Sequence, residues 1–217
     1  MAAPKTKVLV LCGDLWHPAH NIHEALQPLE SFGFGFDFID STAEWPAERA
    51  SSYPIIVLAK ANHVSSEDRS PWMTPAVESI FQDTVSAGAG LLVLHSGSAE
   101  YTDCKVLRTL LGGLFTSHPA QCTVSVEPKS DHAVTTGSAQ FARMDEHYMM
   151  DMNDPAVEVF LNTTSEHGVQ PGGWTRREGK GRVCVLTPGH NIPVLLDPSY
   201  QAIIRNALEW CGAINEP

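Results

Sequence analysis

The stretch that decides the fold is "LLVLHSGSAEY", which runs from Leu91 to Tyr101. Four apolar residues lead directly into His95, and Ser96 and Gly97 follow, which predicts a buried strand that ends at a sharp turn. Many α/β enzymes carry a nucleophile on such a turn, usually serine or cysteine. His95 could therefore be a catalytic group, a metal ligand or part of a turn without chemistry.

Strand-like and helix-like segments alternate on both sides of this stretch. Short apolar runs predict buried strands at 7–12, 36–40 and 53–60, and helical spacing with Pro and Gly at the ends predicts helices at 21–33, 74–88 and 199–212. Strands without polar alternation are typical of a parallel sheet that helices cover on both faces. The later half is less regular, with strands at 121–128 and 157–164 and a hairpin at 172–185. We expect a single α/β domain over residues 1–217.

Composition excludes several classes of protein. The chain has 217 residues, of which 43% are hydrophobic, enough for one large core. Its net charge of −11 disfavours nucleic acid and anionic membranes as partners. No apolar run is long enough to span a membrane, and no signal-cleavage pattern is found, so we expect a soluble, cytoplasmic protein. Five cysteines without a C-x-x-C motif indicate neither a disulfide framework nor a structural zinc site.

Histidines gather where the predicted strands end. In an open α/β sheet, ligands bind beyond the carboxyl ends of the strands. The loops expected there contain His17, His20, His63, His95 and His190. Two histidines three residues apart can meet one metal ion if the backbone turns between them. We therefore predict a divalent metal, zinc being favoured, with His17 and His20 as ligands joined by His95 or His190.

The segment "MDEHYMMD" adds carboxylates to this chemistry. If it is extended, Asp145 and His147 share one face while Glu146 and Tyr148 share the other. General acid–base chemistry at neutral pH uses carboxylates and imidazoles with shifted pKa values. A solvated charged turn is the alternative interpretation. The predicted catalytic residues are His95, Glu146, His190 and Tyr148.

Other residues are candidates for substrate binding. Trp174 beside Arg176 could stack on a sugar, although simple hairpin chemistry also explains the neighbouring glycines. Ser96 is better suited to a helix cap or an oxyanion donor than to a nucleophile, because Leu94 stands where a nucleophile elbow needs a small residue. The predicted substrate-binding residues are Trp16, Ser96, His118, Trp174 and Arg176.

Several blocks together resemble a known family. "LWHPA", "LHSG", "GGLFTSHP", "DEHY", "WTRREGKGRV" and "TPGH" resemble, in order, blocks of the ThuA-like (trehalose-utilisation) family, from about Lys7 to Trp210. The resemblance implies a flavodoxin-like, class I glutamine amidotransferase-like three-layer sandwich with a mostly parallel central sheet. Amidotransferases carry a cysteine at the turn and a glutamate soon after a late histidine. Here His95 stands at the cysteine position and Asn191 follows His190, so we expect no glutaminase activity.

The resemblance also implies a role in sugar catabolism, notably of trehalose and oxidised (3-keto) glycosides, and some members bind a divalent metal. A 3-keto sugar has an acidified C–H bond, so a base and a group that stabilises the enolate suffice for chemistry. We expect an enzyme that acts on a carbohydrate or 3-keto glycoside by metal- or His/Glu-assisted hydrolysis, elimination or isomerisation. The alternative is a non-catalytic carbohydrate- or partner-binding module that has lost amidotransferase chemistry. We expect no nucleotide cofactor, a small carbohydrate as ligand, and a homo-oligomer.

Overall fold

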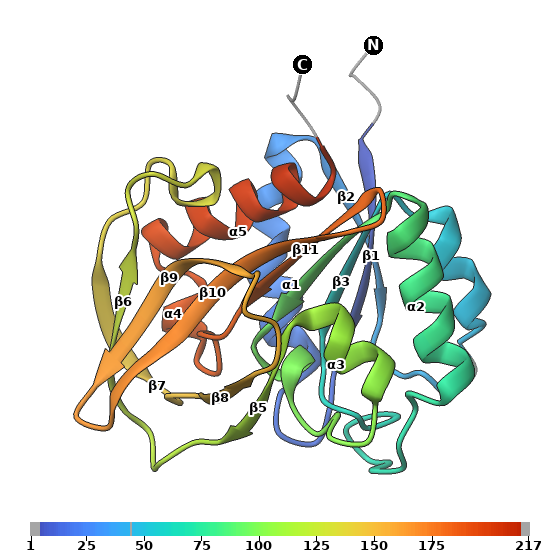
Figure 1. Cartoon of the computed structure of the whole chain (residues 1–217), viewed down its shortest axis with the longest axis horizontal. Coiled ribbons are helices and arrows are strands. Elements are labelled where there is room, and N and C mark those ends of the chain that lie inside the picture. The colour runs from blue at the N-terminus through green and yellow to red at the C-terminus, as the bar shows by residue number, and fades with distance from the viewer. Residues whose placement is uncertain (1–4, 44, 214–217) are drawn as a thin grey trace.

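The computed structural model describes residues 5–43 and 45–213. Within them, a nine-stranded sheet has the order β2-β1-β3-β4-β11-β10-β9-β6-β7, and β5 pairs with β8 in a separate two-stranded sheet (Figure 1). The strands are β1 (Thr6–Cys12), β2 (Phe34–Ile39), β3 (Ile55–Ala59), β4 (Gly90–Leu94), β5 (Gly113–Ser117), β6 (Cys122–Pro128), β7 (Phe141–Asp145), β8 (Met149–Met152), β9 (Glu158–Ser165), β10 (Gly168–Glu178) and β11 (Gly181–Leu186).

Helices cover both faces of the parallel part of the sheet. They are α1 (Ala19–Leu26), α2 (Pro75–Ala87), α3 (Lys105–Leu111), α4 (Ile192–Leu195) and α5 (Pro198–Cys211). Val8 and Val10 of β1 belong to the core shared with α1 and α5, whereas Leu9 and Leu11 belong to the core shared with α2 and α3. Because successive side chains of a strand point to opposite faces, a strand covered on both sides is apolar throughout. None of the helices described is long and apolar enough to cross a membrane.

The expected parallel sheet is present as one half of a larger, mixed sheet. Strands β2, β1, β3, β4 and β11 pair in parallel, but β10, β9, β6 and β7 continue the sheet in antiparallel pairs. The tight turn between β10 and β11 allows only an antiparallel return.

The helix expected at 21–33 is shorter than predicted: α1 ends at Leu26, and a 3₁₀ turn follows over Gln27–Phe32. Pro28 has no N–H to continue the α-helical bonds.

The turn after β4 lies at the centre of the sheet. His95 is buried and has a φ of +41°, in the left-handed region that residues other than glycine seldom adopt. A Cβ on Gly97 would lie 2.0 Å from the carbonyl oxygen of Leu58, so the turn packs directly against β3. The carboxyl ends of β1, β3, β4 and β11 meet at this edge, as the sequence predicted for the loops that carry histidines.

Candidate active site

A cavity of about 470 Å³ opens at the carboxyl edge of the parallel strands. Its volume lies within the range of small-molecule sites, and its lining combines aromatic walls with a few polar groups. The loops after β1, β3 and β11 contribute to it, together with the chain between β7 and β8. The lining residues are Trp16, His17, Ala61, Ala99, Glu100, Phe115, His118, Glu146, Tyr148 and His190.

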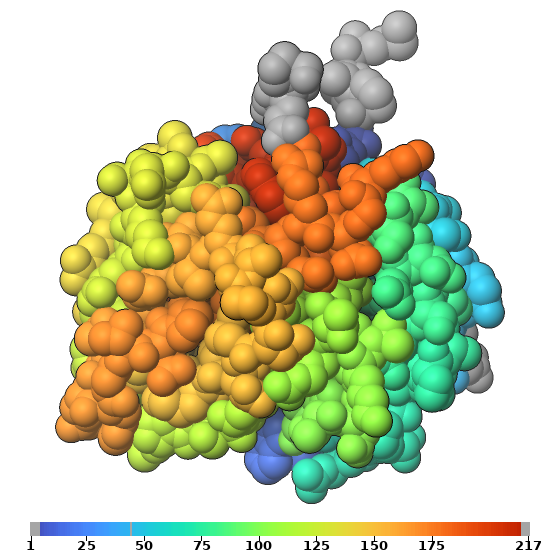
Figure 2. Space-filling view, viewed as in Figure 1, coloured from blue at the N-terminus to red at the C-terminus, as the bar shows by residue number. Residues whose placement is uncertain are grey.

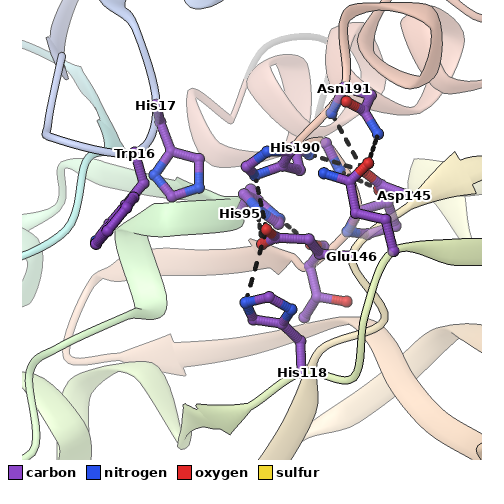
Figure 3. A network of polar contacts seen from close by, with 12 residues as sticks. Trp16, His17, His95, His118, Asp145, Glu146, His190 and Asn191 are labelled. Carbon is purple, nitrogen blue, oxygen red and sulfur yellow. Dashed lines mark hydrogen bonds and ion pairs between the residues drawn. The ribbon is translucent and has the colours of Figure 1, made fainter.

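Three histidines from three different loops converge beside this cavity (Figure 3). The ring centroid of His17 lies 5.0 Å from that of His95 and 5.0 Å from that of His190, and the other two centroids are 5.6 Å apart. One nitrogen of each imidazole and a carboxylate oxygen of Glu146 all lie within 4.8 Å of one another. Three imidazoles and a carboxylate in such a cluster match the donors that late first-row divalent metals prefer.

Asp14 orients His17. The buried Asp14 carboxylate lies 2.8 and 3.0 Å from His17 Nδ1 and also accepts the backbone N–H groups of Ala61 and Trp16. Burial favours the protonated acid, but the hydrogen bond and charge of His17 and the backbone donors together lower the pKa of Asp14 to about 2. Burial also lowers the pKa of His17. A neutral His17 thus donates Nδ1–H to Asp14 and leaves Nε2 free, as metal-ligating histidines do.

His95 is oriented from the opposite side of the turn. Its Nδ1 lies 2.7 Å from the carbonyl oxygen of Thr187, which can only accept, so Nδ1 carries the proton. Its Nε2 is buried, has no hydrogen-bond partner among the described residues and lies 3.5 Å from Glu146 Oε2. The ring stacks on Tyr148 with centroids 4.0 Å apart. The bare Nε2 of His95 is therefore available as a ligand or a base.

Glu146 is surrounded by imidazoles. Its Oε1 lies 3.2 Å from His190 Nδ1 and 3.6 Å from His118 Nε2, and its Oε2 faces His95 (Figure 3). Burial raises the pKa of Glu146, but contacts with His190 and His95 outweigh it and hold that pKa below its ordinary value. The same contact raises the pKa of His190. Near neutral pH, Glu146 is therefore an ionised carboxylate.

Asp145 fixes the loop that carries His190. Its buried carboxylate accepts the backbone N–H groups of Gly189, His190 and Asn191 at 2.8 to 3.1 Å. His147 does not line the cavity and has its Nδ1 2.7 Å from Ser165 Oγ, whereas Glu146 and Tyr148 both line the cavity. The shared face predicted for Glu146 and Tyr148 is therefore the face toward the cavity.

The structure separates two predicted substrate-binding residues from the cavity. Trp174 is fully buried, and its indole N–H donates to the carbonyl oxygen of Leu111. Arg176 donates to the carbonyl oxygens of Thr109 and Leu110. Both satisfy the free carbonyls at the end of α3, and Figure 2 shows this green segment packed against the orange strands. The structure therefore places Trp174 and Arg176 outside the lining of this cavity, with the carbonyls of α3 as their partners.

Two further predicted residues lie apart from the cluster and the cavity. His20 lies in the first turn of α1, is exposed and does not belong to the histidine cluster that includes His17. Ser96 is buried within the turn and does not line the cavity. Trp16 and His118, in contrast, do line it. Whether these two contact a substrate stays a prediction.

Lys60, which follows β3, is a buried cation near the site and supports a pH-dependent prediction. Its Nζ donates to the carbonyl oxygen of Val64, and burial lowers its pKa from 10.5 to about 8. The unfolded chain therefore binds more protons than the folded chain between about pH 8 and pH 10.5, so stability should rise with pH in that window. We expect a gain of about 2 kcal/mol between pH 8 and pH 10.

Urea unfolding at both pH values, compared with Lys60→Met, isolates this contribution. Lys60→Met should not show this rise in the free energy of unfolding between pH 8 and pH 10. Lys129→Met, at an exposed lysine, is the control and should keep it. Equal pH profiles for the wild type and Lys60→Met would contradict the assignment.

The sequence matches a known protein family over most of its length. The family model described as "ThuA: Trehalose utilisation" matches residues 7–211. The chain belongs to the ThuA family. The association of that family with trehalose utilisation suggests a role in sugar metabolism. A search of curated proteins finds no match for this ThuA chain.

Solved structures share the fold. A ThuA-like protein from Parabacteroides merdae is 17% identical with a TM-score of 0.77, and the match covers 98% of this chain and 92% of that one. Another from Bacteroides uniformis is 20% identical with a TM-score of 0.76, covering 97% and 93%. A β-galactosidase from Rahnella sp. R3 is 14% identical with a TM-score of 0.67, covering 95% of this chain and 31% of that one. At these identities the likeness concerns the fold alone.

Proposed function

We propose that this ThuA protein is an enzyme of carbohydrate catabolism that acts on 3-keto glycosides through a divalent metal centre. The ligands are His17, His95 and His190, and Glu146 is the base. The observation that carries the proposal is the convergence of these imidazoles on one carboxylate, with two buried Nε2 atoms, those of His17 and His95, lacking hydrogen-bond partners among the described residues. Leaving buried nitrogens unpaired is costly unless something binds them.

The residues of the cavity suit proton abstraction beside a carbonyl. Glu146 is ionised and can take the acidified proton of a 3-keto sugar. A bound metal would act as a Lewis acid toward the substrate oxygen. Burial raises the pKa of Tyr148 well above its ordinary value, so its hydroxyl stays protonated and can donate a hydrogen bond. Trp16 and Phe115 offer aromatic surfaces for a sugar ring.

The scaffold supports the same proposal. The parallel strands have the order β2-β1-β3-β4-β11, which corresponds to the flavodoxin-like order with ligands at the carboxyl edge. We infer a flavodoxin-like core related to the amidotransferases. At the turn where those enzymes hold a thiol, this chain holds His95, so glutaminase chemistry lacks its nucleophile.

Elemental analysis combined with an activity assay tests the metal centre. We expect a near-stoichiometric divalent metal and turnover of 3-keto-trehalose that a chelator abolishes. His17→Ala should lower the metal affinity by about a hundredfold or more, because losing one of three ligands costs at least as much as losing a partner that orients a ligand. His20→Ala is the matched control, since it lies three residues away outside the cluster, and it should keep both metal and activity.

Metal content and turnover unchanged in His17→Ala would refute the ligand set. A wild-type protein that binds a carbohydrate but converts no 3-keto glycoside, with or without added metal, would favour a non-catalytic binding module instead.

A further inference from the structure

A second carboxylate, Glu100, lines the same cavity outside the histidine cluster. Its backbone has a φ of +63°, which residues other than glycine adopt rarely and only when their surroundings enforce it. The flanking residues supply that enforcement: Ala99 is buried, and buried Tyr101 donates its hydroxyl to the carbonyl oxygen of Lys60 at 2.8 Å. Glu100 is therefore held on the cavity wall in a strained conformation while its side chain remains 41% exposed.

Glu100 has its own histidine. His63 Nε2 lies 2.5 Å from Glu100 Oε2, and the His63 side chain is only 3% exposed. Its Nδ1 is buried without a hydrogen-bond partner among the described residues. The bare Nδ1 indicates the tautomer in which Nε2–H donates to Glu100. A buried imidazole with one unpaired nitrogen costs stability, so packing alone gives no reason for it.

The histidines that contact Glu100 and Glu146 follow different strands. His63 follows β3, whereas His190, the partner of Glu146, follows β11, and β4 lies between these strands in the sheet. Glu146 contacts several imidazoles, whereas Glu100 Oε2 contacts that of His63. Both carboxyl groups line the same cavity with different histidine partners, so each can take a separate role in one reaction.

We propose that Glu100 is the general acid that protonates the leaving oxygen when the site eliminates the aglycone from a 3-keto glycoside, and that His63 positions it. The inference rests on the proposed function, in which Glu146 is the base. Glu146 takes the proton from C2, and the C–H electrons form the enolate with the C3 carbonyl. The enolate then re-forms the carbonyl and the C1–C2 double bond, and the C1–O bond breaks. The departing oxygen takes the proton from Glu100 Oε1, giving an alcohol and leaving Glu100 as a carboxylate.

His63 does not change protonation in this step. Its Nε2–H donates to Oε2 both before and after the proton leaves Oε1, which keeps the carboxyl plane aimed into the cavity. If Glu100 is the general acid, the effect of removing it on the rate of elimination should depend on the leaving group. A sugar or alkoxide needs a proton to depart, whereas 4-nitrophenolate departs without one.

The test compares Glu100→Gln with the wild type on two substrates, 3-keto-trehalose and 4-nitrophenyl 3-keto-glucoside. We expect the variant to lose about 10²-fold in kcat/KM on the first and less than about tenfold on the second. Exchange of the C2 proton in deuterated water should persist, because Glu146 is intact. His63→Gln should also lose more kcat/KM on 3-keto-trehalose than on 4-nitrophenyl 3-keto-glucoside, but both losses should be smaller than those of Glu100→Gln. Glu166→Gln, at an exposed glutamate that contacts the exposed His167, is the matched control and should match the wild type.

Equal losses on both substrates, or no loss, would overturn the acid role. Imidazole nitrogen NMR adds a readout that needs no turnover: His63 should be the Nε2–H tautomer, and Glu100→Gln should shift its Nε2 signal. The Nδ1–H tautomer in the wild type would refute the pair. A wild type inert to both substrates would overturn the proposed function and the acid role with it, whereas an active wild type with an indifferent Glu100→Gln overturns the acid role alone.

Discussion

A Glu146→Gln variant is expected to lose turnover of 3-keto glycosides by about 10²–10⁴-fold, the usual contribution of a positioned base. Glutamine keeps the size of the side chain but cannot accept the proton. It also replaces the negative charge that faces His190, His95 and His118 with a neutral amide. Measurement of kcat/KM on 3-keto-trehalose, together with C2 proton exchange in deuterated water, checks the prediction, because both should fall together.

Glu67→Gln controls for the general effect of losing one carboxylate. Glu67 is exposed and lies outside the cavity, so this variant should behave as the wild type. Activity of Glu146→Gln within tenfold of the wild type, or loss of turnover with C2 exchange intact, would show that another group takes the proton.

Gly97→Ala should destabilise the fold by about 3 kcal/mol or more, or prevent folding. The new methyl group would lie 2.0 Å from the carbonyl oxygen of Leu58 and 3.0 Å from Val93 Cγ1. The first contact is with backbone of β3 in the middle of the sheet, which cannot move aside as a flexible side chain can. Urea unfolding followed by circular dichroism measures the change in the free energy of unfolding.

Gly35→Ala is the matched control for that experiment. Gly35 also lies within the large sheet, but its added Cβ would meet only the side chain of Lys5, at 3.4 Å. We expect a change within about 1 kcal/mol, since glycine has no packing advantage in a strand interior. Similar stabilities for the two variants would mean that the turn after β4 can relax away from β3.

The sequence was sufficient to predict the strands of the parallel half and the edge at which the site lies. Unbroken apolar runs such as Leu91–Leu94 indicate strands covered on both faces, and such strands are typical of parallel sheets. From this alone, His17, His20, His95 and His190 were expected near one another, and the structure brings His17, His95 and His190 together. The face shared by Glu146 and Tyr148 also followed from the two-residue period of extended chain.

Other features depend on tertiary contacts that no local pattern carries. Trp174 and Arg176 lie on β10, beside α3. Because α3 packs there, both side chains donate to carbonyl oxygens of that helix instead of facing a ligand. His20 lies outside the histidine cluster because it belongs to the first turn of α1. Sequence patterns locate such a helix boundary only within a few residues.

Two functional candidates were missed. Asp14 has a signal in "GDLWH", because an aspartate can accept backbone N–H groups two and three residues onward, as it does from Trp16 and His17. Glu100 has none, since its pairing with His63 joins two loops.

The position of β11 beside β4 has a consequence for how the protein is made. Leu94 ends β4, but Gly181 begins β11, so a ribosome adding about 5–20 residues per second exposes the edge of β4 for roughly ten seconds before its neighbour exists. An unpaired apolar strand edge is a template for association with other chains. Nascent chains of this protein should therefore depend on chaperones during that interval, and chains truncated before β11, which lack His190, should aggregate instead of accumulating in a partly folded form.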